Sequence, residues 1–136
     1  LYDRAGSETG EDVLRAMREI ERAARGVGCF FVDHDLLLTA TLAQPTPELG
    51  HLDTTDPMAM VQRAGAYSIL TSPFNVTGQP AISLPLGTDA TGLPLGSQLV
   101  AGFGREDLLL AVGAQLEQAR PWDINPVWPP RREAED

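Results

Sequence analysis

The chain has 136 residues, enough for one domain with a modest hydrophobic core. Its net charge of −9 argues against nucleic acid or an anionic membrane as a partner, because phosphates bind to basic surfaces. The lone cysteine, Cys29, excludes an internal disulfide, and this composition fits a reducing cytoplasm. Because residue 1 is Leu, we expect a fragment or a processed product of a longer protein.

The first predicted element is a helix that begins after Thr9. Thr9 and Asp12 have the spacing of a capping box, in which each side chain bonds the other residue's backbone. Gly26 and Gly28 are expected to end the helix. Apolar residues recur at helical spacing and form one stripe: Val13, Met17, Ile20, Ala24 and Val27. Such a stripe must be buried against another element.

A strand and a second helix are expected next. The apolar run Leu36–Leu42 predicts a buried strand, and the proline-rich and polar residues 44–55 predict a long surface loop. Asp56 followed by Pro57 is typical of a helix start. That helix presents a further set of apolar side chains: Met58, Met60, Val61, Ala64 and Tyr67.

Two strands and a third helix complete the predicted elements. The strands span about 81–86 and 95–101 and are joined by a turn at 88–92. The helix begins near Arg105 and directs Leu108, Leu109, Val112 and Leu116 inward, and residues 121–136 are expected to form an irregular tail. About three helices and three strands indicate an α/β fold. Both edges of so small a sheet would be exposed, which suggests that part of the fold is missing.

Residues 75–99 carry a more specific pattern. Asn-Val-Thr-Gly-Gln-Pro-Ala-Ile-Ser-Leu-Pro stands at 75–85 and Gly-Leu-Pro-Leu-Gly-Ser-Gln-Leu at 92–99. With a strand before them and a helix at 107–116 after them, they resemble the C-terminal region of the amidase signature family, serine hydrolases that cleave carboxamides. The resemblance implies helices packed on a mixed β-sheet. It also implies that residues 1–136 form a single segment, the C-terminal portion of an amidase domain.

The resemblance also implies a mechanism. In this family one serine attacks the amide, a second serine in a cis peptide relays the proton and a lysine accepts it. All three lie upstream of the matching region, and this chain contains no lysine. We therefore expect no catalytic residue here, no metal and no cofactor. The segment alone should be inactive, and its partners should be the remainder of the amidase chain and a small amide substrate.

The resemblance places a substrate pocket at residues 67–74. Tyr67, Ser68, Thr71 and Phe74 are the expected pocket residues, although Tyr67 and Phe74 could simply pack the helix against the sheet. Ser68 stands about where glutamine-dependent amidotransferase subunits of this fold carry an aspartate that recognises the glutamine ammonium. Because serine has no charge, an uncharged amide is the expected substrate. The alternative is a truncated binding or structural module without activity, and the parent protein could be a monomer or a homodimer.

Three local clusters suggest other chemistry, and each has a simpler interpretation. A Cys–His–Asp nucleophile could come from Cys29, Asp33, His34 and Asp35, but Cys29 is more typical of a packed, buried thiol. A metal site could come from His34, His51, Asp53 and Asp56, which otherwise are solvated loop residues. The glycines of Gly102–Asp107 suggest a phosphate loop, but the two acids there favour a helix start.

Overall fold

Four helices and three strands make up residues 6–122, the part of the chain that the computed structural model describes. In chain order they are α2 (Gly10–Asp33), β1 (Leu36–Ala40), α3 (Pro57–Ser68), α4 (Ser72–Thr77), β2 (Ala81–Thr88), β3 (Pro94–Ala101) and α5 (Glu106–Ala119). The predicted α/β class is therefore confirmed. Of the predicted tail, Pro121 and Trp122 are described and have no regular structure, and residues 123–136 lie outside the described part.

The three strands form one antiparallel sheet in the order β1-β3-β2. Leu99 in the central strand pairs with Leu38 on one side and with Ile82 on the other. A bulge between Leu84 and Gly87 interrupts the β2–β3 ladder. The turn between these strands is closed by Asp89, whose carboxylate accepts hydrogen bonds from the backbone N–H groups of Thr91 and Leu93. Local turn chemistry thus sets the hairpin that the sequence predicts.

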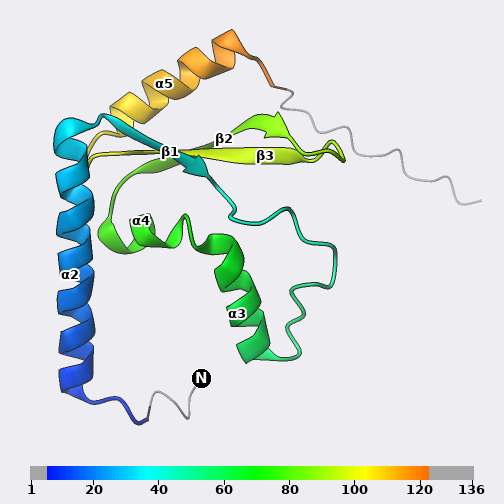
Figure 1. The fold of residues 1–136 in the computed structure, drawn as a ribbon. Helices are drawn as coiled ribbons and strands as arrows, with labels where there is room; N and C mark the ends of the chain where they lie inside the picture. The colour runs from blue at the N-terminus through cyan, green and yellow to red at the C-terminus, as the bar shows by residue number, and fades with distance from the viewer. Residues whose placement is uncertain (1–5, 123–136) are drawn as a thin grey trace, which may run out of the picture.

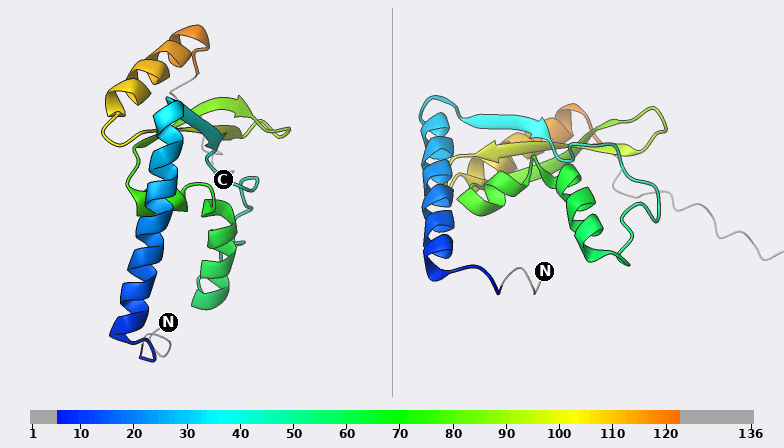
Figure 2. Two further views of the ribbon diagram at one scale, coloured as in Figure 1. Left: turned by 60° about the vertical axis from the view of Figure 1, so that its left-hand side comes forward. Right: turned by 60° about the horizontal axis from the view of Figure 1, so that its bottom comes forward.

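Helix α5 covers one face of the sheet, and α3 and α4 lie on the opposite side (Figures 1 and 2). The core forms under α5, where four residues are buried: Leu84, Leu99, Ala101 and Leu109. Half-buried residues extend it, among them Leu36, Ile82, Val112, Leu116 and Trp122. The inward positions predicted for α5 therefore meet the apolar alternation of β2 and β3, as two packed layers require.

Helix α2 begins as predicted but runs further than predicted. Thr9 Oγ1 accepts a hydrogen bond from the Asp12 N–H at 3.2 Å, and the Thr9 N–H donates to Asp12 Oδ2 at 3.0 Å. The expected end at Gly26 and Gly28 is wrong, because the helix continues to Asp33. Interior glycine costs a helix only about 1 kcal/mol. The last turns also gain a tertiary contact, since the Phe31 side chain lies beside the backbone of Gly102.

Two other elements differ from the sequence expectation. Helix α4 was not predicted, because its six residues are too few to show helical periodicity. It ends at Gly78, whose φ of 82° allows its N–H to bond the Phe74 carbonyl. The expectation of a buried strand at 36–42 is wrong in part. Strand β1 lies at the edge of the sheet, and Leu38 is 64% exposed. No helix in residues 6–122 has the length and apolar character needed to cross a bilayer.

Candidate binding site at the α3–α4 corner

The four residues predicted to line a pocket lie at the corner where α3 gives way to α4. Asp56 starts α3 by accepting hydrogen bonds from the N–H groups of Met58 and Ala59, at 3.0 and 3.1 Å. Tyr67 and Ser68 form the end of α3. Thr71 is the residue before α4, and Phe74 lies inside α4. Because α3 ends at Ser68 and α4 begins at Ser72, all four residues lie within about one helical turn of the corner.

The corner is held by hydrogen bonds to carbonyl groups that the end of a helix leaves without partners. The Tyr67 carbonyl accepts from the Ala43 N–H at 3.0 Å. The Ser68 carbonyl accepts from the Thr71 N–H, from Thr71 Oγ1 and from Ser72 Oγ, at 3.0, 3.0 and 2.8 Å. The backbone of the preceding loop and the hydroxyls of the corner thus supply donors for the Tyr67 and Ser68 carbonyls.

The remaining bond comes from the sheet. Gln98 in β3 points away from α5, and its Nε2 donates to the Leu70 carbonyl at 3.1 Å and to Thr39 Oγ1 at 3.0 Å. Next to it the hydroxyls of Thr41 and Ser83 bond each other at 2.6 Å. This pair fits because Gly96 has no side chain: a Cβ there would lie 2.7 Å from Thr41 Oγ1 and 2.9 Å from Ser83 Oγ. The sheet face toward the corner is therefore polar.

An open groove of about 530 Å³ runs between α2, α3 and α4. Its lining consists mostly of apolar residues with three hydroxyls and one carboxylate: Glu19, Ile20, Ala23, Val27, Gly65, Ser68, Ile69, Ser72, Pro73, Val76 and Thr77. Ser68 is the one predicted pocket residue in this lining, half-buried and 3.4 Å from Ser72 Oγ. The groove can accept an apolar group beside a small number of hydroxyl hydrogen-bonding partners.

The other three predicted residues are oriented differently. The Tyr67 ring packs edge-to-face against His51 with ring centroids 6.0 Å apart. Thr71 uses its hydroxyl on the Ser68 carbonyl. Phe74 is buried, with 9% of its surface exposed. Sequence reasoning did not select the groove residues on α2, or Gln98, because their relation to the corner depends on elements distant in the chain.

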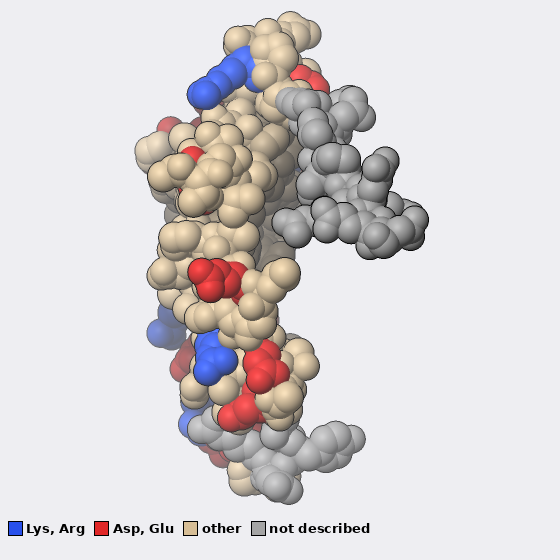
Figure 3. Space-filling view, turned by 90° about the vertical axis from the view of Figure 1, so that its right-hand side faces the viewer, with Lys and Arg blue, Asp and Glu red and all other residues tan. Residues whose placement is uncertain are grey.

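Charge is sparse at this site. Glu19 is the one charged residue in the groove lining, and on the face turned to the right-hand side of Figure 1 acidic and basic residues are scattered among uncharged ones (Figure 3). Among the described residues three carboxyl groups have a lowered pKa: Asp12 and Asp89, which are half-buried and each lowered first by a threonine hydroxyl, and Asp53, which is exposed and lowered first by the Thr55 N–H. They cap a helix or close turns and do not line the groove. The groove therefore offers shape and hydrogen bonds rather than an acid–base pair.

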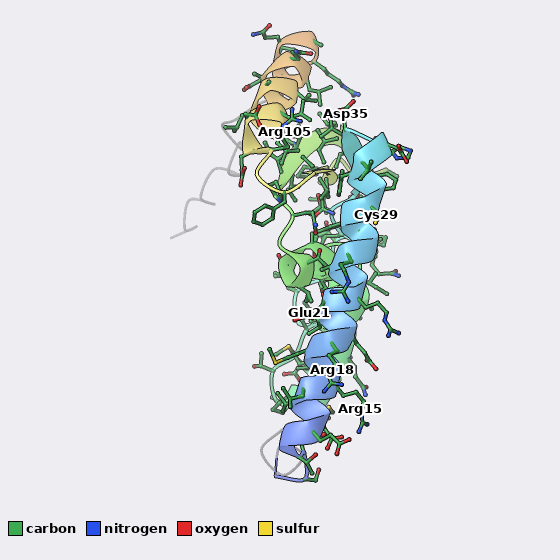
Figure 4. All side chains as sticks on the ribbon, turned by 90° about the vertical axis from the view of Figure 1, so that its left-hand side faces the viewer. Arg15, Arg18, Glu21, Cys29, Asp35 and Arg105 are labelled. Carbon is green, nitrogen blue, oxygen red and sulfur yellow. The ribbon has the colours of Figure 1, made fainter. Side chains whose placement is uncertain are left out.

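The nucleophile and metal clusters suggested by the sequence do not assemble. Cys29 lies in α2 and is exposed, so the expected buried packing role is wrong; Asp35 lies beyond the end of that helix (Figure 4). The His34 ring stacks on Phe30 with a centroid separation of 4.2 Å, and its Nδ1 lies 3.0 Å from the Phe30 carbonyl oxygen. Across residues 6–122 no three His, Cys, Asp or Glu side chains converge in a way that could hold a metal ion.

The segment Gly102–Asp107 forms a tight turn into α5. The Arg105 N–H bonds the Gly102 carbonyl at 3.1 Å, and Gly104 has a φ of 75°. Glu106 and Asp107 occupy the first turn of α5, and Arg105 Nε contacts Asp107 Oδ1 at 3.3 Å. Acidic side chains at the positive end of a helix would repel a phosphate. The segment is therefore a helix start, as the two acids predicted, and not a phosphate loop.

With this geometry in place, comparison with known proteins identifies the fold. A solved structure of 6-aminohexanoate cyclic dimer hydrolase complexed with substrate superposes on 88% of this chain with a TM-score of 0.78 and 41% identity. A family model described as Amidase matches residues 3–110. The chain therefore belongs to the amidase signature family, as its motifs predicted.

Two further relatives show the extent of the match. A protein of Mycobacterium leprae (strain TN) named "Putative amidase AmiC" is 41% identical over 120 residues, which are 88% of this chain and 26% of that protein. The 6-aminohexanoate-cyclic-dimer hydrolase of Pseudomonas sp. (strain NK87) is 50% identical over 130 residues, 90% of this chain and 26% of the hydrolase. The chain thus spans about a quarter of the length of these relatives.

Proposed function

We propose that this chain is the C-terminal segment of an amidase that hydrolyses a small, uncharged carboxamide to a carboxylate and ammonia or an amine. The observation that carries the proposal is the 50% identity to a cyclic-dimer hydrolase over 90% of this chain. In a cyclic dimer of 6-aminohexanoate every amino and carboxyl group is part of an amide, so that relative's substrate has no charge. An uncharged amide is also what Ser68 suits, because serine cannot neutralise a substrate ammonium.

Within such an enzyme the segment would supply part of the sheet core and one wall of the acyl pocket. The wall is the α3–α4 corner with Tyr67, Ser68, Thr71 and Phe74. Support comes from the groove beside it, where the Ser68 side chain lies among apolar residues of α2, α3 and α4. An acyl chain needs an apolar lining with few polar groups, and this lining has that composition.

The catalytic groups would come from the part of the protein that precedes this segment. The resemblance assigns the reaction to a serine pair and a lysine, and the 136 residues contain no lysine. The segment alone should therefore be inactive, and the complete protein should need no metal or cofactor. The single cysteine fits a cytoplasmic location. The lack of lysine also supports the second candidate, a truncated module that binds or packs without catalysis.

The proposal is tested on the longest native product that contains this sequence. Its intact mass and upstream peptides show whether a serine pair and a lysine precede residue 1. Purified product is then assayed with short uncharged amides, with a cyclic diamide and with glutamine. Hydrolysis of the uncharged amides supports the amidase. If the native product begins near Leu1 and cleaves none of them, the non-catalytic module is correct.

A matched pair of variants tests the pocket wall. Ser68→Asp places a carboxylate in the groove, whereas Ala66→Asp places one on the exposed surface of the same helix, outside the groove lining. We expect Ser68→Asp to lower kcat/KM for uncharged amides about tenfold or more and to favour amides that bear an ammonium group. Ala66→Asp should leave both unchanged. Equal behaviour of the two variants would exclude Ser68 from the pocket.

A further inference from the structure

We propose that Gln98 is a positioning residue: it fixes the α3–α4 corner from the sheet side and thereby sets which acyl groups the pocket accepts. The inference rests on the proposed function, since it concerns the wall that carries Ser68. Gln98 is not placed against the substrate. It acts through the Leu70 carbonyl, which lies between Ser68 and Thr71 in the chain.

Burial makes Gln98 unusual in this structure. Among residues 6–122 it is the one buried polar or charged side chain, with 4% of its surface exposed. Burying a side-chain amide costs free energy of folding unless its hydrogen bonds are formed. Both Nε2 donations are made, to Thr39 Oγ1 and to the Leu70 carbonyl. The side chain therefore connects the central strand, an edge strand and the corner between two helices.

The corner depends on this connection because of where α3 ends. The carbonyls of Tyr67 and Ser68 have donors from the chain backbone or from neighbouring hydroxyls. The Leu70 carbonyl has Gln98 Nε2 as its hydrogen-bond donor. Without that donor, a carbonyl near the polar sheet face must reorient, and the adjoining residues must shift with it. A displaced binding wall holds acyl groups of different length differently, so it changes the discrimination between substrates.

The test uses the full-length protein and two uncharged amides that differ in the length of the acyl group. Gln98→Met keeps a similar volume and removes both donations, whereas Thr39→Val removes one acceptor and leaves the Leu70 bond in place. We expect Gln98→Met to change the ratio of kcat/KM between the two amides about tenfold, mainly through KM. Thr39→Val should keep that ratio within about twofold. An equal change in both variants, or none in Gln98→Met, would overturn the proposal.

A second variant keeps the test decisive if Gln98→Met does not fold. Gln98→Glu can donate one O–H to Leu70 when protonated and none when ionised. Its acyl selectivity should approach that of the wild type at low pH and diverge as the glutamate ionises, while wild-type selectivity stays constant. Selectivity that does not vary with pH in folded Gln98→Glu refutes the role. A wild-type protein that cleaves no amide refutes the proposed function instead, so the two failures are distinguishable.

Hydrogen exchange supplies a readout that does not depend on activity. The Thr71 and Phe74 amides bond the Ser68 and Thr71 carbonyls within the corner. In Gln98→Met they should exchange faster than in Thr39→Val, because the corner has lost its bond to the sheet. Equal exchange in the two variants would show that Gln98 does not position the corner.

Discussion

The two apolar faces of this segment, one under α5 and one along α2, differ in how far they are buried. Under α5 the side chains of Leu84, Leu99 and Leu109 are buried, with exposed fractions of 7, 6 and 3%. Along α2 the predicted apolar stripe has no buried member: Val13 and Met17 are each 54% exposed. Both faces have the periodicity that burial requires, but only the face under α5 is buried. Helix α2 contacts α4, yet none of its residues is buried among the described residues. Amphipathic pattern therefore shows that a surface must be covered, and not what covers it.

The contrast also separates two kinds of stability. The α5 layer and the hairpin form a core within this segment, whereas α2 makes its main helix contact with the short helix α4. A segment that spans about a quarter of its relatives leaves room for further elements against α2 and at the edges of the sheet. Four measurements would test this division between a closed core and an open face.

The largest effect is expected in the closed core. Leu109→Ala should lower the free energy of unfolding by about 3 kcal/mol, because it removes buried methyl groups and leaves a cavity. Leu110→Ala, at the neighbouring exposed position, should change it by less than about 0.5 kcal/mol. Leu109 is 3% exposed and Leu110 is 66% exposed. Urea denaturation of both variants provides the comparison. Equal midpoints would mean that burial of the α5 residue Leu109 does not stabilise the fold.

The effect of a substitution in the apolar stripe of α2 should depend on whether further elements cover that stripe. In the 136-residue chain Met17→Gln should be neutral, because Met17 is already half-exposed to water. In a longer native product that covers α2, the same change should cost about 2 kcal/mol of burial. Arg18→Gln, on the adjacent charged surface of α2 in Figure 4, should be neutral in both. Melting temperatures of both lengths test this, and a neutral Met17→Gln in the longer protein would show that α2 stays exposed.

The polar sheet face offers a smaller, local test. A Cβ at Gly96 would lie within 3 Å of Thr41 Oγ1 and Ser83 Oγ, whereas one at Gly87 would meet no atom within 4 Å. Gly96→Ala should therefore cost about 1.5 kcal/mol through overpacking and loss of the Thr41–Ser83 bond. Gly87→Ala serves as the control on the paired strand. Chemical denaturation that ranks the two variants equally would contradict the close approach at Gly96.

The smallest effect concerns pH at the start of α2. The Thr9 hydroxyl, followed by the Thr9 N–H, holds the pKa of Asp12 below its usual value. A depressed folded-state pKa means that the carboxylate stabilises the helix above the unfolded-state pKa, and that this contribution is lost as pH falls through the folded-state pKa. NMR titration of Asp12 checks this. In Thr9→Val the pKa should rise toward the usual value; an unchanged pKa would show that the capping box does not act on it.

Local chemistry explains which elements could be predicted. Thr9 with Asp12, Asp56 with Pro57, and the hairpin turn closed by Asp89 all act within a few residues, so their structures follow from the adjacent sequence. Helix α4 was missed because Ser72–Thr77 is shorter than two helical turns. The extension of α2 past two glycines was missed because the contact of Phe31 with Gly102 joins distant parts of the chain.

The candidate site divides in the same way. The motifs around residues 75–99 were sufficient to predict the family, and the resemblance selected Tyr67, Ser68, Thr71 and Phe74 as one short segment. That this segment turns a corner between α3 and α4 was not predicted. Only the tertiary structure determined that Ser68 joins α2 in a groove and that Gln98 reaches Leu70 from the central strand. The physical reason is that capping, turns and periodicity depend on neighbours in sequence. Grooves and buried hydrogen bonds depend instead on which distant elements the sheet register and packing bring together.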